Sequence, residues 1–200
     1  LKGASSLLDK DGKEVGHIEG RFVLTRQVNT RCPELSDQAL RGVALEPNAD
    51  NTLLLYDNPD LGVRFLHPRR WRVARVTGSQ VALDGAEGSG LLLTVGSLAR
   101  TPTAEQFLAE SRAYLEKQKA RLLRVEPARK VRAAPPLEQF ALEAEMGGQK
   151  FLMDYYTTRQ ASGGVTLAAR LLPRDLASLR KEVARMAQSV VVTRKAENPK

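Results

Sequence analysis

Cysteine and histidine are nearly absent from this 200-residue sequence, which holds one cysteine, Cys32, and two histidines, His17 and His67. One cysteine excludes an intramolecular disulfide and a zinc site built from several thiolates, and it is compatible with a reducing or an oxidising compartment. The histidines lie 50 positions apart, so the sequence offers no local pair that could share a metal ion. We expect His67 to end a strand half buried rather than to serve as a ligand or a base.

Long hydrophobic runs are also missing. No stretch of about 18 or more apolar residues occurs, so the sequence predicts no membrane-spanning helix. The N-terminal residues lack the basic-then-apolar order of a signal peptide. Because the chain begins with Leu1 instead of methionine, we expect it to be part of a longer protein.

Motifs for catalysis and for phosphate binding are lacking as well. Residues 87–90 do not form a GxSxG nucleophile elbow, no glycine-rich phosphate loop occurs, and Cys32 has no histidine close in sequence. Asp9 and Asp11 resemble the start of a calcium loop, but the twelfth position is Gly20 instead of an acidic residue, which favours a hairpin turn. The sequence therefore predicts no catalytic residue, no cofactor and no metal site.

Positive charge is the most unusual feature that the sequence does have. Lys and Arg number 31 against 23 Asp and Glu, giving a net charge of +8, and 42% hydrophobic residues are typical of a globular protein. Residues 1–51 carry a net charge of −1, whereas residues 52–200 carry +9. The composition changes at the same place, so we expect a domain boundary near Asn51.

The N-terminal part of the chain predicts a β hairpin. Leu7 and Leu8 precede a turn signal at residues 9–12, and an alternating pattern then runs over residues 14–28. Residues 29–51 are rich in Asn, Pro, Asp and Glu, which is typical of an irregular linker. We therefore expect three parts, namely a hairpin with its linker in residues 1–51, a folded domain in residues 52–194 and a disordered tail in residues 195–200.

The folded domain is predicted to combine short strands with two amphipathic helices. Alternating patterns and Gly or Pro turn signals predict strands over residues 52–56, 62–67, 72–76, 80–84, 91–97, 123–130, 137–146, 151–159, 165–172 and 190–193, the first five as one meander. A capping box at Thr103 and Gln106 begins the first helix, whose apolar stripe includes Tyr114 and Leu122, and Pro173 opens the second. The order predicts an α+β fold, a largely antiparallel sheet with two covering helices.

Three acidic residues fall on one predicted sheet face. Glu143 and Glu145 alternate on one strand, and Asp154 lies across the Gly147-Gly148 hairpin from them. We expect all three to be exposed and paired with Arg or Lys on adjacent strands, rather than to hold a cation.

Arginine-rich stretches are the one constellation that points to a function. The predicted basic surface consists of Arg64, Arg69, Arg70, Arg72 and Arg75 around Trp71, and of Arg124, Arg129, Lys130 and Arg132, with Arg121, after the first helix. Guanidinium groups bind carboxylate or phosphate through two parallel hydrogen bonds, so this surface could engage an acidic protein, nucleic acid or anionic lipid. The simpler interpretation is a solvated surface with Trp71 in the core. Aromatic residues make up 5% of the chain, which argues against nucleic acid.

A strand that ends in Phe65, Pro68 and Trp71, together with a C-terminal helix over residues 176–186 and a short strand over 190–192, resembles the PsbP-like domains. The resemblance covers about residues 52–194. It implies an α/β/α sandwich that is shared with a Ran-binding nuclear transport factor and with bacterial lipoproteins of unassigned role. It also implies no catalytic residues, and it favours a location outside the cytoplasm.

These patterns favour a non-catalytic interaction module of a larger or exported bacterial protein, which binds an acidic protein partner through the Arg-rich surface. Anion or nucleic-acid binding through the same surface is the alternative, and an uncharacterised hydrolase is the third option. The sequence leaves the partner and the oligomeric state open.

Overall fold

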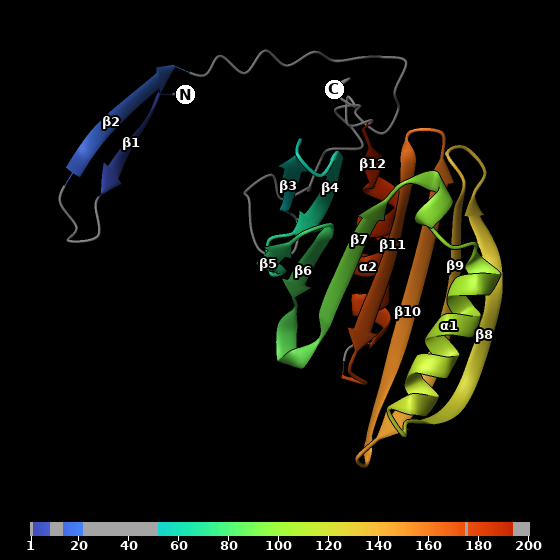
Figure 1. Cartoon of the computed structure of the whole chain (residues 1–200). Helices are drawn as coiled ribbons and strands as arrows, with labels where there is room; N and C mark the ends of the chain where they lie inside the picture. Colours follow the sequence, from blue (N-terminus) through green and yellow to red (C-terminus); the bar gives the residue numbers. More distant parts are fainter. Residues whose placement is uncertain (1, 9–13, 22–51, 175, 194–200) are drawn as a thin grey trace, which may run out of the picture. The chain divides into compact units, whose positions relative to one another are not determined.

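The computed structural model describes residues 2–8, 14–21, 52–174 and 176–193 (Figure 1). The chain divides into two compact units, Leu1–Glu46 and Pro47–Lys200. In the first unit, β1 (Lys2–Leu8) pairs antiparallel with β2 (Glu14–Arg21). The turn expected at residues 9–12, the strand expected to continue over 22–28, the linker of residues 29–51 and the tail of residues 195–200 lie outside the described residues.

The second unit is built on a seven-stranded antiparallel sheet (Figure 1). In spatial order this sheet contains β5 (Arg72–Thr77), β6 (Gln80–Asp84), β7 (Gly90–Gly96), β11 (Gly163–Leu171), β10 (Gln149–Gln160), β9 (Leu137–Met146) and β8 (Arg121–Arg132). A separate three-stranded sheet has the order β12 (Val191–Val192), β4 (Val63–Pro68) and β3 (Leu53–Asn58). Two short 3₁₀ turns, η2 (Ala86–Gly88) and η3 (Leu98–Arg100), flank β7.

All ten strands expected in this unit are present, but the prediction that the first five form one meander is wrong. The Trp71 N–H donates to the Pro68 carbonyl oxygen (2.9 Å), which closes a tight turn after β4. This turn sends β5 into the larger sheet, whereas β3 and β4 stay in the smaller one. The closing strand β12 then pairs with β4, where Val191 lies opposite Arg64.

The first helix, α1 (Ala104–Lys117), begins as its sequence predicts and ends earlier. The Gln106 N–H donates to Thr103 Oγ1 (3.2 Å) and the Thr103 N–H donates to Gln106 Oε1 (2.9 Å), so the expected capping box is confirmed. Lys119 adopts a left-handed backbone conformation (φ 59°) and turns the chain out of the helix. Leu122 therefore lies in β8 instead of on the helical stripe, and Tyr114 is 61% exposed, so both assignments to the buried stripe were wrong.

Two apolar clusters cover the two faces of the larger sheet. One face packs against α2 (Leu176–Ser189) and the three-stranded sheet, with Trp71, Leu167 and Val183 among the fully buried side chains. The other face packs against α1 through Phe140, Tyr155 and their neighbours. Phe140 and Tyr155 are stacked at a centroid distance of 4.6 Å. The layers are therefore α1, the larger sheet, and then α2 beside the smaller sheet, an α+β sandwich as predicted.

Trp71 packs in the core, as the simpler interpretation of its sequence context holds. Its side chain is 1% exposed, its indole N–H donates to Glu182 Oε2 (2.7 Å), and a Cβ placed on Gly85 would lie 3.0 Å from the ring. The ring is thus enclosed between α2 and the segment at Gly85 that follows β6, and it is not available to stack on a ligand.

We predict that Trp71→Ala lowers the free energy of unfolding by about 4 kcal/mol, because it removes a fully buried indole and leaves a cavity. Trp71→Phe should cost about 2 kcal/mol, since it keeps an aromatic ring but leaves the Glu182 carboxylate one donor short. Urea unfolding followed by circular dichroism measures both, because Trp71 is the sole tryptophan and fluorescence would be lost. A loss below about 1 kcal/mol for Trp71→Ala would contradict the burial of the ring.

Candidate interaction surface

The two basic groups predicted from the sequence lie apart in the fold, the first on β4, the following turn and β5, and the second on β8. Arg72 and Arg75 are on β5, the first strand in spatial order, and the second group is on β8, the last. Six inter-strand spacings of about 4.8 Å place these edges roughly 29 Å apart. The structure therefore does not bring β5 and β8, and the basic residues on them, together at one edge of the sheet.

Two arginines of the first group, Arg70 and Arg64, form ion pairs within the fold. Arg70 forms an ion pair with Glu182 and donates to Ser178 Oγ (3.2 Å), so it holds the turn after β4 against α2. Arg64 pairs with Asp57 (3.4 Å). Exposed ion pairs contribute little stability, but they do neutralise charge.

Other members of the first group remain at the surface. Arg72 lies 3.8 Å from Asp84, and both side chains are mostly exposed. Arg69 and Arg75 are exposed and make no ion pair with a described carboxylate. They flank a buried Trp71, so the first group has no accessible aromatic ring beside it.

The second group is gathered on one face by irregularities in β8. Its register with β9 shifts between residues 122 and 124, between 126 and 129, and between 130 and 132. As a result Arg121, Arg124, Glu126, Arg129 and Arg132 all lie opposite odd-numbered residues of β9 and share the face that carries α2, whereas Lys130 points to the α1 face. Strict alternation would have put Arg121 and Arg124 on opposite faces.

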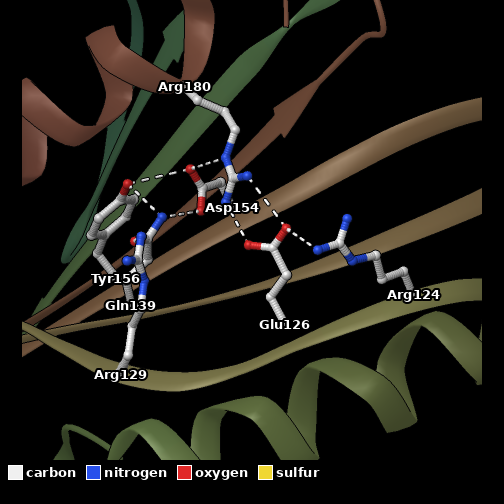
Figure 2. Close-up of polar contacts among 7 residues, drawn as sticks. All are labelled: Arg124, Glu126, Arg129, Gln139, Asp154, Tyr156 and Arg180. Carbon is white, nitrogen blue, oxygen red and sulfur yellow. Dashed lines mark hydrogen bonds and ion pairs between the residues drawn. The ribbon is translucent and has the colours of Figure 1, made fainter. Parts of the chain in front are cut away.

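Beside these arginines, Arg180 of α2 joins the helix to two strands (Figure 2). Its Nη2 donates to Glu126 Oε2 of β8 (2.8 Å) and its Nε to Asp154 Oδ2 of β10 (3.4 Å). Arg124 lies 3.8 Å from Glu126 on the other side. The hydrogen bond from Arg180 lowers the pKa of Glu126, against the effect of its partial burial.

Asp154 is fully buried, with an exposure of 0%, so the expectation that it lies on an exposed sheet face is wrong. Asp154 points toward α2. The alternation of residues along the strand does not reveal that this helix covers the face on which Asp154 lies. Gln139 Nε2 donates to Asp154 Oδ1 (2.8 Å), and the Tyr156 hydroxyl donates to Oδ2 (3.3 Å). Burial raises the pKa of Asp154 above its ordinary value, although the hydrogen bond from Gln139 and the charge of Arg180 oppose that rise.

The network continues through Gln139 to the surface (Figure 2). Its amide nitrogen also donates to the Tyr156 hydroxyl oxygen (2.9 Å), and its amide oxygen accepts from Arg129 Nη2 (2.8 Å). Burial, and then the neighbouring carboxylate of Asp154, raise the pKa of Tyr156. For Arg180, the hydrogen bonds and charges of Glu126 and Asp154 outweigh burial and raise its pKa, so the guanidinium stays charged.

This arrangement binds one structural element to another and offers little to a reaction. The Asp154 carboxylate is shielded from solvent and accepts hydrogen bonds from three donors, so it cannot reach a substrate as an acid or base.

Glu143 and Glu145, the other two acidic residues expected on this sheet face, lie beside arginines of the adjacent strand. Glu145 pairs with Arg121 (2.8 Å), and Glu143 lies opposite Arg124 in the register.

The described residues hold no candidate metal site and no candidate membrane span. His67 is 6% exposed, more buried than expected, and its Nδ1 lies 3.1 Å from the Pro68 carbonyl oxygen. Within the described ranges, no three His, Cys, Asp or Glu side chains come together as a metal site. Among those ranges there is also no helix long and apolar enough to cross a membrane.

We predict that Arg180→Met lowers the free energy of unfolding by about 3 kcal/mol at pH 7, because it leaves the buried Asp154 carboxylate without its cation. Since the pKa of Asp154 in the folded state lies above its unfolded value, its ionisation costs stability as the pH rises through the folded-state pKa. The loss caused by Arg180→Met should therefore shrink at low pH, where Asp154 is protonated.

The control is the double variant Arg180→Met with Asp154→Asn, in which residue 154 carries no charge that could be left without a partner. It should be more stable than Arg180→Met at pH 7 and lose the pH dependence of the difference. Urea unfolding at several pH values measures all three proteins. An equal loss at low and neutral pH would show that Arg180 acts by packing alone.

This architecture is similar to that of solved protein structures. No protein-family model matches the chain, and no curated protein matches its sequence. Among solved structures, cyanobacterial PsbP from Synechocystis sp. PCC 6803 shares 17% identity over 76% of this chain and 97% of its own, with a TM-score of 0.48.

The Ran-binding protein Mog1p from Saccharomyces cerevisiae shares 8% identity over 70% of this chain and 95% of its own, with a TM-score of 0.52. A Mog1 variant gives 8% identity, coverages of 71% and 96%, and a TM-score of 0.53. At such low sequence identities the similarity is one of fold alone, and it rests on the two Mog1 structures. The chain has the PsbP-like fold, which the two Mog1 structures share, as the resemblance around Phe65, Pro68 and Trp71 predicts.

Proposed function

We propose that residues 52–194 form a non-catalytic interaction module that binds an acidic protein partner at the end of β8. The same fold serves a protein described as Ran-binding, so protein recognition is within its reach. The partner chemistry proposed here rests on the charges of this chain. A location outside the cytoplasm, which the PsbP-like resemblance favours, belongs to the same proposal and is testable by cell fractionation.

The last three cations of β8 form no ion pair with a described carboxylate, and the proposal rests on this. We call Arg129, Lys130 and Arg132 the β8 cations. Arg129 donates to the neutral amide oxygen of Gln139 (2.8 Å), and Lys130 lies opposite Glu138 in the ladder without forming an ion pair. Arg132 donates to the carbonyl oxygens of Pro135 (2.9 Å) and Gln188 (2.6 Å). Within the described part of the chain, none of the three cations forms an ion pair with a carboxylate.

Each β8 cation has a different part in this surface. Arg132 reaches a carbonyl in the last turn of α2, where a cation is favoured by the helix dipole, so it serves the fold. Arg129 is exposed on the α2 face of the edge strand β8 and Lys130 is exposed on its α1 face, and both use few of their donors. Lys181 and Arg185 on the adjacent helix are exposed as well and extend the positive surface along α2. An acidic segment would find several unsatisfied donors there.

Nucleic-acid binding, the alternative expected from the sequence, has less support. A single-stranded nucleic acid is held by bases stacked on exposed aromatic side chains, and the ring of Trp71 is buried. The two basic groups also lie apart in the fold, so they do not form one continuous track for a phosphate backbone.

We predict that Arg129→Ala with Lys130→Ala weakens binding of a fluorescein-labelled oligo-glutamate peptide at least about fivefold, because two unpaired cations are removed. Fluorescence anisotropy at low salt measures the affinity, and circular dichroism confirms folding. The matched control is Arg69→Ala with Arg75→Ala, which removes the same charge from the β4–β5 turn and from β5 and should leave the affinity nearly unchanged.

Two results would overturn the proposal. An equal loss in both double variants would mean that only net charge matters. Tighter binding of duplex DNA than of the peptide, with a steep loss as salt rises, would favour the nucleic-acid alternative.

A further inference from the structure

Half of the sheet face on the α1 side has no helix over it among the described residues. The first helix packs mainly on β8 and β9, and Figure 1 shows it in front of that end of the sheet, away from β6 and β7. Burial along the strands agrees. On β11, Val165, Leu167 and Ala169 are buried toward α2, whereas the intervening residues toward α1 are only half buried. The same alternation holds on β6 and β7.

A cavity of about 560 Å³ occupies this uncovered half beside α1. We call it the α1 groove. Its floor is apolar and comes from four strands, with Ala82, Leu92, Ala168 and Met153 as the central side chains. The flank of α1 forms one wall through Phe107, Glu110, Ser111 and Tyr114, which recur at helical spacing. The volume lies in the range of protein binding sites.

The shape of the α1 groove fits a second helix lying beside α1. The strands β6, β7 and β11 span two inter-strand spacings, about 10 Å, which is the diameter of a helix with its side chains. Two alanines on the floor, Ala82 and Ala168, allow a helix backbone to approach closely. An occupant in this position would complete the helical layer that α1 leaves half finished.

The charges at the rim select the occupant. Glu110 is exposed and has no ion pair among the described residues, and Asp84 has only the long, exposed contact with Arg72 (3.8 Å). The one cation of the lining, Arg170, is turned to other partners. It donates to Gln149 Oε1 (2.9 Å) and lies 5.0 Å from the centre of the Phe151 ring. An apolar floor with unpaired carboxylates at its edge complements a helix that is apolar on one side and basic beside it.

We propose that the α1 groove binds a basic amphipathic helix of a partner protein, seated between α1 and the β6–β7 hairpin. This site lies on the opposite face of the sheet from α2, takes a partner of the opposite charge, and does not depend on the interaction proposed at β8. The apolar side of the partner helix covers Leu92 and the two alanines, and its Lys or Arg side chains pair with Glu110 and Asp84.

The test uses a labelled synthetic peptide of about 18 leucines and lysines, arranged so that the leucines fall on one helical face. A scrambled peptide of the same composition is its control. Fluorescence anisotropy measures binding to the full chain. The expected result is binding of the amphipathic peptide at least about tenfold tighter than that of the scrambled one.

Two variants locate the site. Glu110→Lys should weaken peptide binding about tenfold, whereas Glu116→Lys, an equal charge change on the same helix outside the α1 groove, should have little effect. Ala82→Phe fills the floor and should abolish binding, with circular dichroism confirming that this variant is folded.

Three outcomes would overturn the proposal. The first is equal binding of both peptides, and the second is equal weakening by Glu110→Lys and Glu116→Lys. The third is binding of the neutral apolar dye N-phenyl-1-naphthylamine, lost in Ala82→Phe, that the amphipathic peptide fails to displace. That result would assign the α1 groove to a small apolar molecule.

Discussion

A buried carboxylate that stays ionised requires a positive partner, and in this domain α2 supplies it. Asp154 is fully buried on β10, and the Arg180 guanidinium that neutralises it comes from the helix. Two residues further along, Glu182 faces the other flank of α2 and holds Arg70 and the Trp71 indole. The helix is thus fastened on both sides by groups that would be costly to leave unpaired, while Leu179, Val183 and Met186 supply the apolar contact beneath it.

Such a fixed helix has consequences for both faces of the larger sheet. On the α2 side, Glu126 and Asp154 both form ion pairs with Arg180. These carboxylates are therefore not available to the cations at the end of β8, and that end of the strand stays positive. On the α1 side there is no comparable polar anchor over β6 and β7, and an apolar floor is left half exposed. The two faces therefore present surfaces of different chemistry, one basic and polar, the other apolar with an acidic rim.

Local signals in the sequence were sufficient for the elements and insufficient for their partners. The capping box at Thr103 fixed the start of α1, because its two hydrogen bonds involve residues three positions apart. Nothing local showed that the turn after Pro68 divides the strands between two sheets, or that bulges in β8 gather its arginines on one face. Asp154 was misplaced for the same reason, since its burial depends on Arg180, which arrives from a distant helix. Gln139, Tyr156 and Arg180 formed no recognisable motif.

The pairing of β12 with β4 bears on how the domain is made in the cell. Val191 and Val192 lie opposite Arg64 and Val63, so one edge of β4 is satisfied only after the chain has been synthesised through Val192. Until then, a growing polypeptide carries an open strand edge and the unshielded apolar residues that α2 later covers. Folding of this domain is thus expected to be completed only after the C-terminal helix and strand have been synthesised.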